Sequence, residues 1–165
     1  MTQRKGFTLL ELLVAMIIMA ILASLIIGNL NSSLIKGRDS QRKNDLAEMQ
    51  RALEFYYQDN NGYPTTAQLN STTTRLTGPN GKVYMYKLPT DPKSGMGYTY
   101  TYVPDEVNSP PTYYYLYSAL ENSQDTGTSI SQTGFTTTAQ CSTATTVLCK
   151  YYVSSSNATP LTANP

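Results

Sequence analysis

Apolar side chains fill a nearly continuous run at the start of the chain, from Phe7 to about Leu30, and its only charged residue is Glu11. A helix needs roughly 20 apolar residues to cross a bilayer, so the run predicts a membrane-spanning helix over residues 7–30. A carboxylate in apolar surroundings is costly unless a partner compensates its charge. Either Glu11 is tolerated in this helix, or it has a partner.

Beyond residue 30 the pattern becomes amphipathic, and the helix is expected to continue over residues 31–61. Four apolar residues at helical spacing form a stripe that would pack on a globular domain: Leu46, Met49, Leu53 and Tyr56. Asp39 stands four residues before Lys43, which is the spacing of a helical ion pair. In the sequence DNNGYP, Gly62 is expected to cap the helix, and Pro64 to prevent its continuation.

The remainder, residues 62–165, is expected to form a globular head with antiparallel strands and a polar C-terminal region rich in Ser and Thr. Short segments with alternating or β-prone residues predict strands over residues 83–88, 98–102, 113–121 and 145–153. Turn residues separate them, which favours antiparallel pairing. A long helix packed on a small antiparallel sheet places the chain in the α+β class.

Composition excludes several functions. The net charge is +1, so no global field attracts nucleic acid, and we expect no nucleic-acid partner. Histidine is absent, which removes the usual acid–base catalyst, and no catalytic constellation can be assembled from the residues present. We therefore expect a protein that is not an enzyme. After Asp125 the only charged residue is Lys150, and this polar region is expected to contribute little to a buried core.

The segment KGFTLLELLVAMIIMAILAS, with its short basic leader, resembles the N-terminus of type IV pilins and type II secretion pseudopilins. The resemblance covers residues 1–65 strongly, extends less closely to about residue 122, and is lost beyond. It implies a pilin-like fold. It also implies that residues 1–6 are a leader, that prepilin peptidase cuts between Gly6 and Phe7, and that the new N-terminus is methylated.

Cleavage would create an amine at Phe7 that is mostly protonated at neutral pH, because its reference pKa is near 8. The resemblance implies that Glu11 pairs with this amine on a neighbouring subunit. The alternative is local, since Thr8 and Glu11 also have the spacing of a capping box at a helix N-terminus. Many relatives carry Pro where this chain has Gly28. We expect a continuous helix through Gly28 in the monomer and a possible helix break there in a filament.

Basic residues flank the apolar run unequally. Two precede it, Arg4 and Lys5, while four follow it, namely Lys36, Arg38, Arg42 and Lys43. The positive-inside rule alone would place the C-terminal side in the cytoplasm. The leader and the exported character of the head take precedence, so we expect the head outside the cytoplasm.

Cys141 and Cys149 are the only cysteines, and in an exported domain so close a pair predicts a disulfide. Major pseudopilins have a calcium-binding loop where this chain reads LENSQDTGTSIS, with Glu121 and Asp125. The ligand pattern is not a clear match. We therefore expect no cofactor, with calcium as the alternative.

The resemblance implies a structural subunit of a type IV pilus-like or type II secretion pseudopilus filament, polymerised through its N-terminal helix. Expected partners are further copies, minor pilins or pseudopilins, prepilin peptidase, and an inner-membrane assembly platform with its ATPase. Before assembly the chain would cross the inner membrane once, and afterwards it would lie in a periplasmic or cell-surface filament. The alternative is a membrane-anchored exported binding domain, with a signal segment that is uncut or is cut after Ala23.

Overall fold

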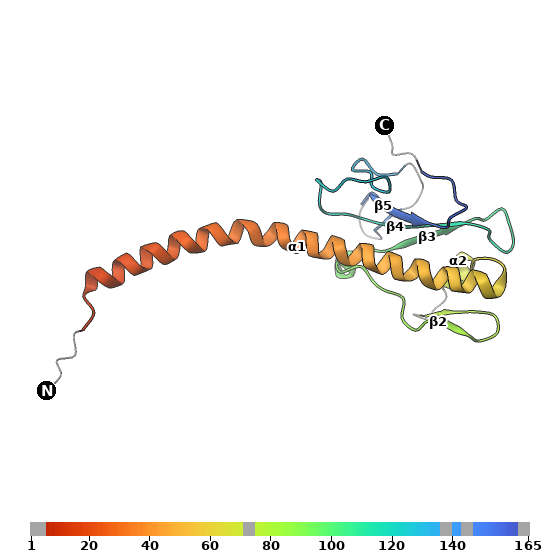
Figure 1. Ribbon diagram of the computed structural model, residues 1–165, viewed down its shortest axis with the longest axis horizontal. Helices are drawn as coiled ribbons and strands as arrows, with labels where there is room; N and C mark the ends of the chain where they lie inside the picture. Colours follow the sequence, from red (N-terminus) through yellow and green to blue (C-terminus); the bar gives the residue numbers. More distant parts are fainter. Residues whose placement is uncertain (1–5, 71–74, 136–139, 143–146, 162–165) are drawn as a thin grey trace. The chain divides into compact units, whose positions relative to one another are not determined.

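The computed structural model describes residues 6–70, 75–135, 140–142 and 147–161, except for the side chains of residues 25–29 and 70. The chain divides into two compact units, residues 1–37 and residues 38–165. The long helix α1, Leu9–Asn60, contributes to both (Figure 1). The helical conformation predicted for this part of the chain is therefore confirmed, with the helix beginning at Leu9, and the helix continues through Gly28 without interruption.

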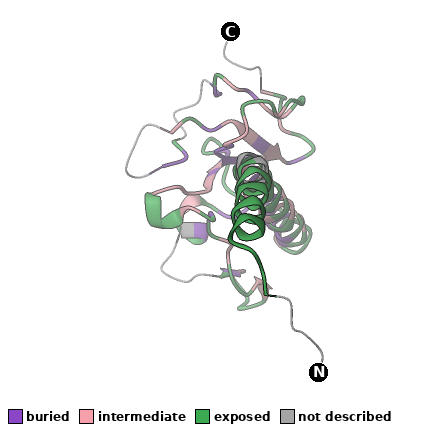
Figure 2. Ribbon diagram, turned by 90° about the vertical axis from the view of Figure 1, so that its left-hand side faces the viewer, coloured by how far each residue is buried: buried purple, intermediate pink, exposed green. Residues whose placement is uncertain are grey.

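In the first unit, all residues of α1 whose burial is described are exposed except the partly buried Ile35, and Figure 2 colours this part of the helix as exposed. Within the described part of the chain, no helix combines the length and the apolar character that crossing a membrane requires.

The second unit surrounds the rest of α1 with short elements. They are α2 (Thr66–Asn70), β1 (Leu76–Thr77), β2 (Val83–Met85), the 3₁₀ turn η1 (Ser94–Met96), β3 (Thr101–Pro104), β4 (Tyr114–Ser118) and β5 (Tyr151–Ser154). Strands β1 and β2 pair with each other, and β3, β4 and β5 form a second sheet in that order. All pairs are antiparallel, as predicted. Figure 1 shows β3–β5 on one side of the helix and β2 on the other.

The observed strands are shorter than predicted. The segment 98–102 contains only the start of β3, and Tyr98 instead forms an isolated bridge with Ser142. The last strand begins at Tyr151, whereas residues 145–146 of the predicted strand lie outside the described residues.

Strand β4 is the centre of the head because all five of its residues are buried. Alternate side chains of a strand point to opposite faces. Tyr114 and Leu116 join the predicted stripe of α1 in one apolar cluster, together with Tyr102 of β3. Tyr115 and Tyr117 belong to a second cluster on the other face. The run of tyrosines and leucine in this strand thus reflects burial on both of its faces.

The C-terminal region builds that second cluster. Phe135, Cys141, Cys149 and Tyr152 are all buried against the outward tyrosines of β4. The expectation that this polar region adds little to the core is therefore wrong. A few apolar residues, spaced among Ser and Thr, are enough because the face of β4 supplies the rest of the apolar surface.

Helix α1 ends differently from the sequence prediction. The residue in the left-handed conformation is Asn61, with φ 52°, and its N–H donates to the carbonyl of Tyr57. Asn tolerates this conformation better than most non-glycine residues. Gly62 is needed for space instead, since a Cβ there would lie 2.4 Å from the side chain of Pro110. The cap assigned to Gly62 is corrected to Asn61.

Candidate assembly site

The N-terminus of α1 is closed by a reciprocal pair of residues. The backbone N–H of Thr8 donates to Glu11 Oε2 at 3.0 Å, as does its hydroxyl, and the N–H of Glu11 donates to Thr8 Oγ1 at 3.3 Å. This is the geometry of a capping box, which satisfies donors that the first turn of a helix leaves unpaired. Both hydrogen bonds that Thr8 donates end on Oε2 of Glu11, and no hydrogen bond to Oε1 is found among the described residues.

Large apolar side chains follow this cap on every side of the helix. Leu9 is 84% exposed, Leu10 71% and Met19 73%, and the other members include Leu12, Leu13, Val14, Met16, Ile17, Ile18, Ile21 and Leu22. We call residues 7–22 the apolar surface. Exposed apolar areas on this scale mark contacts with lipid or with other proteins.

The predicted processing junction lies just before the cap. Phe7 is 89% exposed, and no atom of the described chain lies within 4 Å of the position that a Cβ on Gly6 would take. Gly6 is therefore unobstructed in the single chain. Gly28, farther along, lies within α1, and its role as a helix break in a filament stays a prediction.

The head contains a buried ion-pair cluster that the sequence did not predict. The side chain of Arg42 is fully buried and bonds three carboxylates, those of Asp39, Asp91 and Glu121. Burial alone would lower the pKa of Arg42, but the hydrogen bonds to the three acids outweigh it and raise that pKa above its ordinary value. Two further cations, Arg38 and Lys93, also bond Glu121.

The predicted ion pair between Asp39 and Lys43 is replaced by other partners. Asp39 accepts from Arg42 and from the backbone N–H groups of Glu121 and Asn122. Lys43 bonds Asp125 at 2.6 Å. Three of the four basic residues that follow the apolar run, Arg38, Arg42 and Lys43, thus form ion pairs with acids of the head. The one available signal was the density of charges between residues 36 and 54, which exceeds that of any other stretch.

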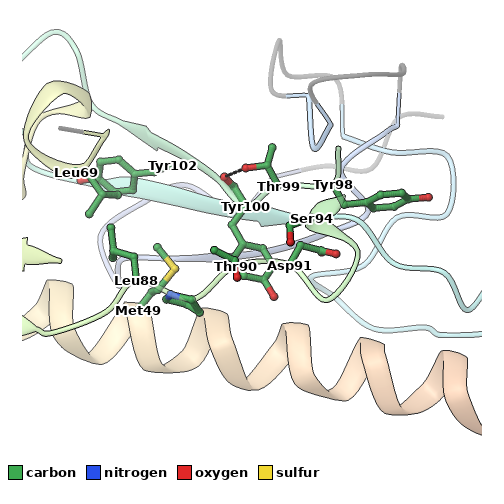
Figure 3. Close-up of a pocket in the computed structure, with 11 residues that line it drawn as sticks. Met49, Leu69, Leu88, Thr90, Asp91, Ser94, Tyr98, Thr99, Tyr100 and Tyr102 are labelled. Carbon is green, nitrogen blue, oxygen red and sulfur yellow. Dashed lines mark hydrogen bonds between the residues drawn. The ribbon is translucent and has the colours of Figure 1, made fainter. Parts of the chain in front are cut away.

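Figure 3 shows a small cavity of about 160 Å³ in the head, between α1, α2 and the start of β3. Met49, Leu69, Leu88 and Tyr102 give it apolar walls, and Asp91 is its acidic residue. The carboxylate of Asp91 is already bonded to Arg42, so the cavity offers no unpaired charge to a ligand. Within the described ranges, no three His, Cys, Asp or Glu side chains cluster as a metal site.

Cys141 and Cys149 form the predicted disulfide. Both are buried in the second cluster, where they pack beside Phe135 and Tyr152. The bridge therefore joins two parts of the segment that covers the outer face of the sheet.

Comparisons with known proteins agree with this geometry. Residues 1–27 match the family model described as prokaryotic N-terminal methylation motif, and residues 29–132 match that of type II secretion system (T2SS), protein G. The type II secretion system core protein G of Escherichia coli (strain K12) is 37% identical over 97 residues, 54% of this chain and 67% of that protein. Its counterpart in Vibrio cholerae serotype O1 is 37% identical over 98 residues, 56% of this chain and 67% of that protein. No solved structure gives a significant match.

Proposed function

The chain belongs to the type II secretion system protein G family and is a structural subunit of a pseudopilus, and we propose that it polymerises through the apolar surface of α1. The observation that carries this proposal is the exposure of that surface in the single chain. Side chains such as Leu9 and Met19 gain nothing from packing within their own subunit. Burial of a large apolar side chain contributes roughly 1.5–3 kcal/mol, so covering this surface with other subunits provides a strong drive to assemble.

Glu11 directs this assembly. In our proposal, cleavage after Gly6 releases an amine at Phe7, and Glu11 of one subunit pairs with the amine of the next. The cap is compatible with this pairing, because both hydrogen bonds from Thr8 end on Oε2 of Glu11. The amine of the neighbouring subunit would then bond Oε1. At an effective dielectric near 20, charges about 4 Å apart gain on the order of 4 kcal/mol before desolvation is subtracted. The same carboxylate can therefore cap its own helix and receive a neighbour.

Lipid covers the apolar surface before assembly. In this proposal, residues 7–30 lie in the inner membrane with the head outside the cytoplasm, and the assembled filament is periplasmic. Prepilin peptidase processes the leader, and an assembly platform with its ATPase drives polymerisation. Minor pseudopilins join the same filament. The family is a structural one, which supports a role without catalysis.

A filament assay tests the proposal. Negative-stain microscopy and sedimentation of sheared material are expected to find filaments for the unaltered chain and few or none for Glu11→Ala. The matched control is Glu106→Ala, which removes an exposed carboxylate of the head. Membrane insertion of Glu11→Ala should persist, because removing a carboxylate makes an apolar segment easier to insert. Filaments at unaltered yield from Glu11→Ala would contradict the pairing role.

A further inference from the structure

The loop after β4, residues 121–132, is where the family resemblance suggested a calcium ion. Its carboxylates are Glu121 and Asp125. Calcium takes about six to eight oxygen ligands, chiefly carboxylates, carbonyls and waters. Whether the loop suits the ion therefore depends on which of its oxygens are available.

Glu121 is already saturated with cations. Its Oε1 accepts from Arg38 at 2.8 Å and from Arg42 at 2.8 Å, and its Oε2 accepts from Arg38 at 2.6 Å and pairs with Lys93 at 2.7 Å. Three positive side chains thus surround this carboxylate. A divalent cation at this position would be repelled by them and would have to displace charge-assisted hydrogen bonds.

Asp125 has a cation of its own. Lys43 Nζ lies 2.6 Å from Asp125 Oδ2 and 5.8 Å from the centre of the Tyr151 ring. The ammonium group, which comes from α1, is thus held between the loop and β5. It therefore already occupies one oxygen of this carboxylate, and its charge would repel a metal ion there.

The backbone of the loop is also engaged. Gln132 Nε2 donates to the carbonyl of Asn122 at 3.2 Å and to the carbonyl of Asp125 at 2.7 Å. The buried Oε1 of Gln132 has no hydrogen-bond partner among the described residues. Both carboxylates and two carbonyls of the loop are thus already bonded to other groups of the chain, and this arrangement does not fit the set of ligands that calcium needs.

We propose that Lys43 and Gln132 hold this loop in the way a divalent cation would, so that the head of this protein folds and remains stable without calcium. Lys43 supplies the positive charge at Asp125, and the side-chain amide of Gln132 donates to two carbonyls of the loop and holds them close together. The cluster around Arg42 fixes the first residue of the loop. The loop is thereby tied to α1 by side chains of the chain itself.

Thermal unfolding of the full-length chain in detergent micelles tests this, followed by near-ultraviolet circular dichroism of its tyrosines. The midpoints in millimolar CaCl₂ and in excess EGTA are expected to coincide. A midpoint that rises with calcium concentration and falls again with EGTA would overturn the proposal. The assay uses unassembled protein, so its result is independent of whether the chain forms filaments.

A double-mutant cycle tests the role of Lys43 directly. Lys43→Met and Asp125→Asn are each expected to lower the midpoint and to speed proteolysis within residues 121–132. The double variant should be no less stable than the poorer single variant, because both remove the same interaction. Lys87→Met, which alters an exposed lysine, is the matched control. Additive losses, or a loop equally protected in Lys43→Met, would refute the assignment of Lys43.

Discussion

Arg42 and Asp91 form a two-pronged ion pair that water does not reach. Arg42 Nε lies 2.7 Å from Asp91 Oδ2, and Nη2 lies 3.0 Å from Oδ1. Their side chains are 0% and 1% exposed. The pair joins α1 to the turn before η1, and Asp91 also accepts from the N–H of Lys93. Because the planar guanidinium of Arg42 bonds both oxygens of Asp91, it fixes the orientation of the turn and compensates the buried charge of Asp91.

Replacing Arg42 with Ala is expected to destabilise the head severely. Removing one partner of a buried ion pair typically costs about 3–5 kcal/mol, because the remaining charge stays buried without compensation. Here three carboxylates lose a partner together. Urea unfolding followed by circular dichroism measures the change. Arg51→Ala, at an exposed position of the same helix, should stay within about 0.5 kcal/mol of the unaltered chain. Equal midpoints for the two variants would contradict a structural role for Arg42.

Acid is expected to weaken the head. Hydrogen bonds from Arg38, with help from Lys93 and Arg42, lower the pKa of Glu121 from 4.5 to about 2. The Asn108 amide, with Thr112, lowers the pKa of Asp105 from 3.8 to about 2. Each carboxyl group binds its proton more readily when unfolded. Its contribution is complete above the ordinary pKa and is lost as the pH falls toward about 2.

Melting temperatures recorded from neutral to strongly acidic pH check this expectation. The midpoint should be nearly constant near neutrality and fall below about pH 5, and Glu121→Gln should reduce the fall. The exposed Glu106→Gln serves as the control. An unchanged pH profile for Glu121→Gln would show that this carboxylate does not account for the acid sensitivity.

The mature chain is expected to begin at Phe7 and to carry an N-methyl group. The reason is the Gly6–Phe7 junction behind a basic leader, within the part that matches the methylation motif. Mass spectrometry of the purified membrane or filament protein measures both features. A chain that starts at Ser24 would instead indicate an ordinary signal peptidase, and the processing expected at Gly6 would then be wrong.

The disulfide is expected to stabilise the segment over the outer face of the sheet. Alkylation of exported protein without reduction should label neither Cys141 nor Cys149. Replacing both with Ser should cost roughly 2–3 kcal/mol, since a closed loop restricts the unfolded chain. Urea unfolding of the oxidised, reduced and double-Ser forms measures this. The reduced and double-Ser forms should have the same free energy of unfolding. A double-Ser form as stable as the oxidised protein would contradict the prediction.

The features that the sequence determined by itself depend on neighbours along the chain. The continuous apolar run predicted a long helix, and the stripe from Leu46 to Tyr56, which recurs at helical spacing, predicted the face that the helix buries. The capping pair of Thr8 and Glu11 lies within one helical turn. The disulfide had one possible pairing because the chain has two cysteines.

Tertiary structure alone decided which distant groups meet. Arg42 bonds Asp91 and Glu121, which are 49 and 79 residues away, and no periodic pattern connects them. Lys43 has Asp39 four residues away on its own helix, yet it pairs with Asp125, because Arg42 and two backbone N–H groups from the loop already bond Asp39. The C-terminal region likewise became core only because β4 exposes a second row of tyrosines to it. A residue's charge and spacing are local properties, whereas its partner depends on how the sheet folds back over the helix.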